Sequence, residues 1–117
     1  MTAHRWIFPA RVVRVYDGDT LTLSVDLGFC VAIQIITGRL DGIDTPEVRG
    51  PSRPDGLLAR DWVREQLAAA TDVRIATRPP SGRQTGKYGR WLITVWADGD
   101  NLNEKLVEVG HAVRRTY

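Results

Sequence analysis

The stretch LTLSVDLGFCVAIQI, residues 21–35, contains two runs of alternating apolar and other side chains on either side of Gly28. Alternation with a period of two is typical of a strand that buries one face. The two runs are therefore predicted to be consecutive strands with a turn at Gly28. The second run carries its large apolar residues at every second position, namely Phe29, Val31, Ile33 and Ile35. In this pattern Cys30 is expected to be a small apolar residue within the second strand.

Three further strands are expected outside this pair. Residues 11–15 are rich in β-branched side chains and are followed by Asp17-Gly18, a strong turn signal. Residues 73–77 and 91–96 have strand composition and are separated by a loop rich in Pro and Gly. The chain is therefore predicted to form five short strands.

Two helices complete the predicted fold. Residues 56–70 follow a Pro-rich loop and carry an apolar stripe at helical spacing, formed by Leu58 or Ala59, Trp62, Val63, Leu67 and Ala70. Asn103 is expected to cap a short helix that Gly110 ends. The order of three strands, helix, two strands, helix fits a five-stranded oligonucleotide-binding (OB) barrel, an α+β fold that is mainly β.

Length and composition indicate one domain, residues 1–117, with an ordinary soluble balance of 43% hydrophobic and 26% charged residues. A single cysteine excludes an intrachain disulfide, and no apolar run approaches the ~18 residues of a membrane span. Residues 1–9 do not resemble a signal peptide, which favours the cytoplasm unless the chain is a mature form whose export signal has been removed. A monomer with no protein or membrane partner is expected.

Charge is distributed unevenly, although the net charge is only +2. Residues 73–97 contain no acidic residue and five basic ones, which are Arg74, Arg78, Arg83, Lys87 and Arg90. Acidic residues gather earlier in the chain. One part of the chain is therefore expected to meet anions and another part a cation.

Two acidic motifs lie at predicted strand ends, Asp17-Gly18-Asp19-Thr20 and Asp44-Thr45-Pro46-Glu47. Hard divalent cations prefer oxygen ligands, and two carboxylates with a backbone carbonyl and waters would leave coordination positions open for a substrate. Taken separately, the first motif is more typical of a plain turn, and the second is more typical of a loop or helix start.

Two arginines form a second set, Arg39 and Arg90, near the ends of predicted strands. Cleavage of a phosphodiester builds negative charge on the phosphoryl oxygens, which a guanidinium meets with paired donors and a permanent charge. The alternative for either arginine alone is a solvated surface charge.

Together, three separated motifs resemble the staphylococcal (micrococcal) nuclease family. They are YDGDT at residues 16–20, RLDGIDTPE at residues 39–47 and KYGR at residues 87–90. The pattern GxxAxxW at residues 56–62 and NLNE at residues 101–104 agree with it. The resemblance extends over nearly the whole chain, and it implies a minimal form that lacks the third helix of longer relatives.

The resemblance implies a calcium-dependent nuclease that hydrolyses DNA and RNA, with a preference for single-stranded or frayed segments, and leaves 3′-phosphate ends. Asp19, Asp44 and the carbonyl of Thr45 would bind Ca²⁺. Glu47 would orient or deprotonate the attacking water, and Arg39 and Arg90 would stabilise the transition state. Substrate would contact Lys87 and Tyr88, with Tyr117 as the candidate for base stacking.

A rival reading is an OB module that binds single strands without cutting them. The acidic residues argue against it, because they would repel phosphates unless a cation lay between. A protein-interaction domain would require a large exposed apolar patch, and none is expected from the sequence.

Overall fold

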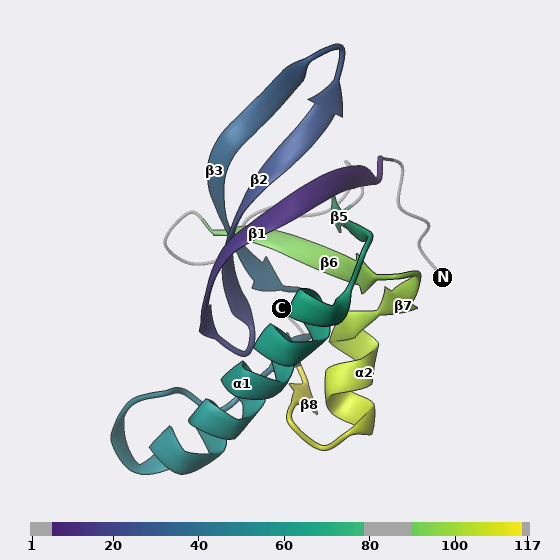
Figure 1. The fold of residues 1–117 in the computed structure, drawn as a ribbon. Helices are drawn as coiled ribbons and strands as arrows, with labels where there is room; N and C mark the ends of the chain where they lie inside the picture. The colour runs from purple at the N-terminus through teal and green to yellow at the C-terminus, as the bar shows by residue number, and fades with distance from the viewer. Residues whose placement is uncertain (1–5, 79–89, 116–117) are drawn as a thin grey trace.

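The computed structural model describes residues 6–78 and 90–115 (Figure 1). Its elements follow in the order β1 Phe8–Asp17, β2 Thr20–Gly28, β3 Val31–Leu40, β4 Ile43–Asp44, η1 Gly50–Ser52, α1 Arg53–Ala69, β5 Val73–Thr77, β6 Trp91–Ala97, β7 Asp100–Asn101, α2 Leu102–Glu108 and β8 Val113–Arg114.

Five strands close into a barrel in the order β3-β2-β1-β5-β6. A parallel pairing of Gly38–Leu40 in β3 with Trp91–Ile93 in β6 completes the circle, and all other pairings in this sheet are antiparallel. The short strand β7 pairs with β6 outside the barrel, and β4 pairs with β8 in a separate ladder. The predicted five-stranded OB barrel with two helices is therefore confirmed.

The hydrophobic core fills the barrel and continues beneath the helices. Leu21, Leu23 and Val25 of β2 point into it, as their alternation predicts. Strand β6 is buried on both faces from Leu92 to Val95, because the barrel lies on one side and helix α2 packs on the other. This core is what fixes the strand ends on which the predicted site residues lie.

Helix α1 begins at Arg53, three residues before the predicted start at Gly56. Pro54 lies in its first turn, where the missing N–H has no helical partner to lose and the fixed φ suits a helix. The buried face carries Gly56, Ala59 and Val63, so Ala59 and not Leu58 belongs to the apolar stripe.

Helix α2 is capped by Asn101, whose side-chain oxygen accepts a hydrogen bond from the Glu104 N–H at 3.1 Å. The prediction that Asn103 is the cap is wrong. Asn103 lies inside the helix and is buried. Its oxygen accepts from Val95 N–H at 3.1 Å, and its Nδ2 donates to the carbonyls of Asp41 and Ile93 at 3.0 Å.

Within the described residues, no helix is long and apolar enough to cross a membrane.

Strands β2 and β3 form a long hairpin that extends beyond the rest of the barrel (Figure 1). The predicted strands are confirmed, but two predictions about the second run are wrong. Cys30 lies in the turn with Phe29, both with positive φ, and is exposed. Large apolar side chains of this run are also exposed. The alternation predicted the strand correctly, but no helix or second sheet among the described residues covers its apolar side chains.

Candidate active site

Arg39 joins the two carboxylates that the sequence predicts as metal ligands. Its Nη1 lies 2.7 Å from Asp19 Oδ2, and its Nη2 lies 2.8 Å from Asp44 Oδ1. The Arg39 and Asp19 side chains are buried, whereas Asp44 is partly exposed. Arg39 near the end of β3, Asp19 in the turn before β2 and Asp44 at the end of β4 thus meet at one end of the barrel. The contact with Asp44 is a charge-assisted hydrogen bond, which is strong and directional, whereas the contact with Asp19 is an ion pair.

Asp19 is fixed from several directions. Its Oδ2 accepts from the Thr45 backbone N–H at 3.0 Å, and its Oδ1 accepts from the Thr20 hydroxyl at 3.2 Å. Its backbone carbonyl accepts from Leu40 N–H at 2.8 Å. A buried carboxylate is tolerated when it is paired and hydrogen-bonded in this way. The side chain is therefore held in a single place before any ligand binds.

The donor set suits a hard divalent cation. Asp19 and Asp44 contact the two Nη atoms of one guanidinium, so both carboxylates face the same side chain. The buried Thr45 Oγ1 has no hydrogen-bond partner among the described residues. In those residues no group of three or more His, Cys, Asp or Glu side chains gathers around one point. Two carboxylates and neighbouring Thr oxygens fit a cation that keeps several waters.

Glu47 follows β4 on a segment that is tied to its surroundings through the backbone. The Glu47 carbonyl accepts from Ser52 Oγ at 3.1 Å, and the next carbonyl, of Val48, accepts from Arg53 Nη1 at 3.1 Å. Val48 N–H donates to Asp17 Oδ1 at 3.3 Å. A Cβ built on Gly56 would lie 2.0 Å from the Glu47 carbonyl oxygen, so only glycine allows this approach. The Glu47 residue itself is exposed.

Burial and the neighbouring charges at this end of the barrel shift the pKa of the Asp17 carboxyl. Burial raises the pKa of its carboxyl above the ordinary value, and the negative charges of Asp19 and Glu47 raise it further. The Val48 N–H and the positive charge of Arg39 act in the opposite direction. Through its hydrogen bond with Val48 N–H, Asp17 links the Glu47 segment to the end of β1.

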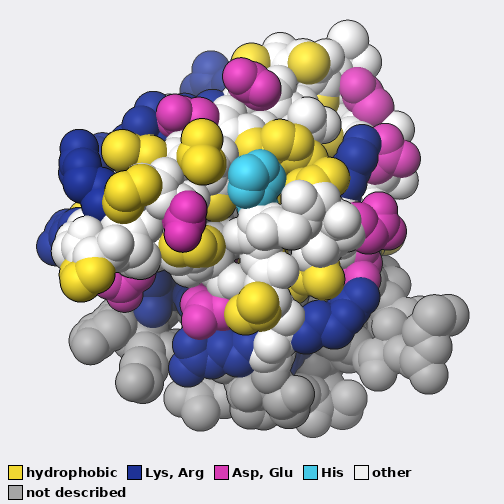
Figure 2. All heavy atoms as spheres, turned by 90° about the horizontal axis from the view of Figure 1, so that it is seen from below, with side chains coloured by type: hydrophobic (Ala, Val, Ile, Leu, Met, Phe, Trp, Pro, Cys, Tyr) yellow, Lys and Arg dark blue, Asp and Glu magenta, His cyan; other side chains and the backbone are white. Residues whose placement is uncertain are grey.

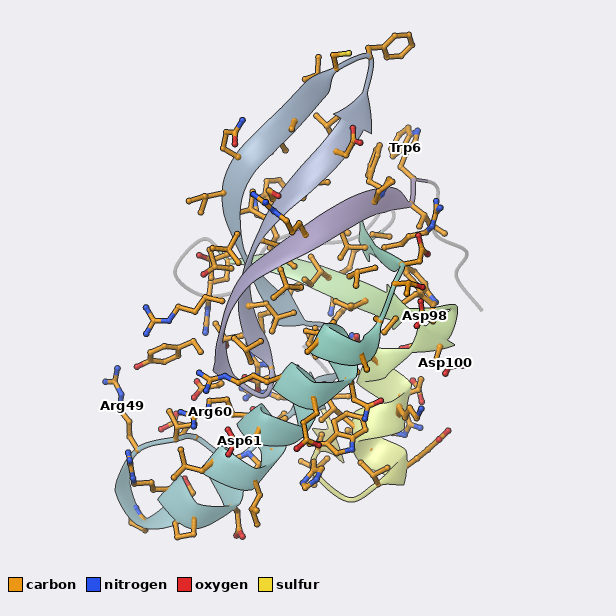
Figure 3. The ribbon with its side chains drawn as sticks, in the orientation of Figure 1. Trp6, Arg49, Arg60, Asp61, Asp98 and Asp100 are labelled. Atoms are coloured by element: carbon orange, nitrogen blue, oxygen red, sulfur yellow. The ribbon has the colours of Figure 1, made fainter. Side chains whose placement is uncertain are left out.

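A basic cluster lies beside the Glu47 segment. Arg49 donates a hydrogen bond to the Tyr16 hydroxyl, and its guanidinium lies 5.5 Å from the ring centroid. The Arg14 guanidinium lies 5.6 Å from the same centroid. Arg49 reaches outward at the edge of the molecule, beyond Arg60 and Asp61 of α1 (Figure 3). Seen from below, Lys and Arg side chains gather around the rim with Asp and Glu beside them (Figure 2).

The sequence also predicts that the substrate contacts Arg90, Lys87, Tyr88 and Tyr117. The structure describes only Arg90 among them. Arg90 is half-buried and directly precedes Trp91, whose Cα pairs with Gly38, the residue before Arg39. The backbone therefore brings Arg90 to the same end of β3 as Arg39. Lys87, Tyr88 and Tyr117 lie outside the described residues.

Two contacts at this end of the barrel were missed by the sequence reasoning. Arg115 Nη1 lies 3.5 Å from Asp44 Oδ2, because β8 pairs with β4 and brings Arg115 next to it. Arg78 makes two hydrogen bonds of 2.8 Å to the Asp41 carboxylate. The basic character of residues 73–97 was the available signal for Arg78. A two-residue strand such as β8 leaves none for Arg115.

Fold and site together define an OB barrel that carries a carboxylate–arginine cluster at one end. Residues 37–117 match the family model described as staphylococcal nuclease homologue. The chain is 32% identical over 110 residues to the thermonuclease of Staphylococcus hyicus, covering 92% of this chain and 59% of the relative. It is 34% identical over 112 residues to the thermonuclease of Staphylococcus intermedius, covering 91% of this chain and 59% of the relative.

The chain belongs to the staphylococcal nuclease homologue family. It spans 59% of the length of these two curated relatives.

Proposed function

We propose that this chain is a calcium-dependent nuclease that hydrolyses phosphodiester bonds of DNA and RNA and leaves 3′-phosphate ends. The observation that supports this proposal most directly is the buried Arg39 side chain between Asp19 and Asp44. A guanidinium at the same place as two potential cation ligands suits a substrate that carries negative charge. The thermonuclease relatives add the reaction class.

Asp19, Asp44 and Thr45 would hold the cation. Calcium bound there would polarise the phosphoryl oxygen and lower the pKa of a coordinated water. Asp19 needs little rearrangement, because Thr45 N–H and the Thr20 hydroxyl already fix its carboxylate. Asp44 is more exposed and would face the substrate side of the site.

Arg39 and Arg90 would stabilise the charge that develops on the phosphoryl group. Arg39 lies on a barrel strand that is paired on both sides, so its position varies little. Preorganised donors of this kind typically contribute ~10²–10³ in rate. When substrate and cation bind together, the phosphate would replace part of the contacts that Arg39 makes with the two carboxylates.

Glu47 would orient the attacking water and accept its proton, a role worth about 10²–10⁴ in rate for a well-placed general base. Its segment is anchored through Asp17, Ser52 and Gly56 while its residue stays exposed. Lys87 and Tyr88 would hold a neighbouring phosphate and Tyr117 a base. Single-stranded or frayed segments would fit best, because their bases are free to splay and stack.

The test is cleavage of an end-labelled single-stranded DNA oligonucleotide with calcium, with a chelator, and with magnesium in place of calcium. We expect calcium-dependent cleavage with 3′-phosphate ends. Asp19→Asn should raise the calcium concentration needed for half-maximal activity about tenfold or more. The matched control is Asp61→Asn, on the exposed face of α1, which should leave the calcium titration unchanged.

Three outcomes would count against parts of this proposal. Binding of the oligonucleotide without cleavage under every metal condition would favour the non-catalytic OB module. Cleavage that a chelator does not reduce would remove the metal from the proposal. An unchanged calcium titration in Asp19→Asn would remove Asp19 from the ligand set.

A further inference from the structure

Strand β1 and helix α1 border a groove on the side of the barrel. β1 pairs with β2 over residues 10–17 on one side, but with β5 on the other side only at Phe8 and Pro9. Among the described residues, no strand pairs with this second edge from residue 10 onward. The C-terminal turns of α1 and the residues that lead into β5 lie beside it, and a groove of about 570 Å³ remains between them (Figure 1). Strand backbone without a partner strand can donate hydrogen bonds to a ligand there.

The groove is lined by three arginines, and no acidic residue is among its described lining residues. They are Arg11 and Arg14 of β1 and Arg64 of α1. Arg64 Nη2 donates to the Val15 carbonyl at 3.0 Å, and its Nη1 lies 3.9 Å from Asp61 Oδ1. Arg11 and Arg14 are exposed and form no ion pair with a described carboxylate, whereas most of the other described arginines do. The groove thus carries positive charge that suits an anionic ligand.

A β-bulge sets the direction of Arg14. The register between β1 and β2 shifts between Val12 and Arg14, where β1 contains one extra residue. Strict alternation would turn Arg14 toward the core, as it turns Val12 two positions earlier. Because of the extra residue, Arg14 pairs with Thr22, which lies between two buried leucines of β2 and faces away from the core. Arg11 pairs with Ser24 on the same face, so the bulge places both arginines on one side of the strand.

The basic side chains continue from the groove to the proposed active site. The guanidinium of Arg14 lies 5.6 Å from the centroid of the Tyr16 ring, and that of Arg49 lies 5.5 Å from it. Arg49 follows Glu47 by two positions, and Asp17 at the end of β1 is hydrogen-bonded to the same segment. At ~3.3 Å per residue, the part of β1 between the first arginine of the groove and this end spans about 20 Å. One extended ligand can therefore contact both regions.

We propose that the groove between β1 and α1 binds the phosphate backbone of a nucleic-acid strand whose scissile bond lies at the carboxylate–arginine cluster. Arg11 and Arg14 supply the charged contacts, and arginines and backbone N–H groups are common donors to phosphate oxygens. The choice of ligand rests on the proposed nuclease activity. An acidic peptide would meet the same charges, but the continuity of the basic side chains with the Glu47 segment favours the substrate strand.

The first measurement compares calcium-dependent cleavage of oligothymidylates of about four and about sixteen nucleotides, the usual limits of the site size of an OB fold. A short strand fills the cluster alone, whereas a long strand also reaches the groove. We expect Arg11→Gln and Arg14→Gln each to raise the KM of the long substrate about threefold or more, because a phosphate contact is lost. The kcat values and the kinetics of the short substrate should not change. The matched control, Lys105→Gln on α2, removes the same charge away from the groove and should leave both substrates unaffected.

The second measurement is fluorescence anisotropy of the labelled long strand in a chelator, where binding is followed without calcium-dependent cleavage. The binding constant is measured from about 50 mM to about 200 mM salt, since each lost phosphate contact makes the slope of log K against log salt concentration less negative by ~0.7 for a single strand. We expect this change for Arg11→Gln and for Arg14→Gln. Unlabelled polyglutamate should displace the strand far less well than unlabelled oligothymidylate does.

The outcomes separate this groove from the nuclease activity. Calcium-dependent cleavage with an equal KM for the long substrate in the parent and in both arginine variants overturns the groove alone. No cleavage of either length, with binding that still depends on both arginines, overturns the nuclease and supports the groove. An equal loss in Lys105→Gln shows an effect of net charge and overturns the groove. Displacement by polyglutamate as strong as by oligothymidylate overturns the nucleic-acid ligand in favour of an acidic protein. Circular dichroism melting checks that each variant is folded.

Discussion

The two parts of β3 show what pairing on both sides does to a strand. Residues 31–37 pair on one side only, and their large apolar side chains are mostly exposed. Gly38 and Arg39 pair with β2 on one side and β6 on the other, and both are buried although one of them carries a charge. Burial here follows closure of the barrel and not hydrophobicity. The charged residue lies inside because Asp19 and Asp44 neutralise it.

The largest effect is expected from Arg39→Ala, which removes the charge from the closed part of β3. It leaves the buried Asp19 without its guanidinium, and breaking a buried pair of this kind typically costs about 3–5 kcal/mol. Because Asp44 is partly exposed, we expect a loss of stability near the lower end of this range. Urea unfolding measures it, and turnover should fall at least ~10²-fold.

Arg114→Ala is the matched control, because it removes an exposed arginine paired with Glu104. Exposed pairs of this type contribute little to stability, because water and salt screen both charges. Equal stability losses in the two variants would show that closure of the barrel does not strengthen the Arg39 contacts.

Gly56→Ala should come second. Alanine normally stabilises a helix by roughly 1 kcal/mol relative to glycine. Here its Cβ would meet the Glu47 carbonyl at 2.0 Å, and overpacking of this kind costs about 1–3 kcal/mol. We therefore expect a net loss of stability by urea unfolding, together with reduced turnover as the Glu47 segment shifts.

Glu65→Ala, on the exposed face of the same helix, serves as the reference and should change the free energy of unfolding by less than about 0.5 kcal/mol. A gain in stability for Gly56→Ala would show that the Glu47 segment moves away at no cost.

A smaller effect is expected from Asp98, whose contribution to stability should be lost at acid pH. Its side-chain oxygen accepts from the Thr71 N–H at 3.0 Å and the Asp72 N–H at 2.8 Å. These bonds, that of Asp72 first, hold the pKa of the Asp98 carboxyl below its ordinary value. A lowered folded-state pKa means stability that is present above the ordinary value and is lost as pH falls through the folded one.

Asp98→Asn keeps a side chain that tolerates positive φ but does not titrate. Its free energy of unfolding should fall less steeply below pH ~4 than that of the parent. If the free energy of unfolding falls equally steeply at acid pH in the two proteins, the Asp98 carboxylate does not contribute to stability in this way.

The smallest effect is expected from Ile35→Ala in the open part of β3. Its side chain is mostly exposed in one chain, so truncation should change the stability of the monomer by less than about 0.5 kcal/mol. Urea unfolding measures this change. A loss above 1 kcal/mol would mean that the open part of β3 is covered within one chain.

The sequence predicted elements well where a local period or a turn residue decides them. The strand at residues 73–77 matches β5, and Gly110 follows the end of α2 with a positive φ. The motifs also selected Asp19, Arg39 and Asp44, which the structure brings together. In each case the information lies within a few neighbouring residues.

Properties that depend on distant partners were not predictable in this way. Alternation in residues 29–35 indicated a strand but not whether another layer covers it. Asn103 has the composition of a helix cap, yet its hydrogen bonds to β6 and to Asp41 place it inside α2. Arg115 approaches Asp44 only because β8 pairs with β4, across 71 positions of the chain.

The pairing of β8 with β4 has a consequence for synthesis of the protein. A ribosome makes the chain from its N-terminus, so Asp19, Arg39 and Asp44 emerge long before residues 113–115. Until those residues emerge, β4 lacks its partner strand and Asp44 lacks its contact with Arg115. A nascent chain therefore carries both carboxylates before it has the strand that pairs beside one of them, and the contact between Asp44 and Arg115 forms only after residues 113–115 have emerged.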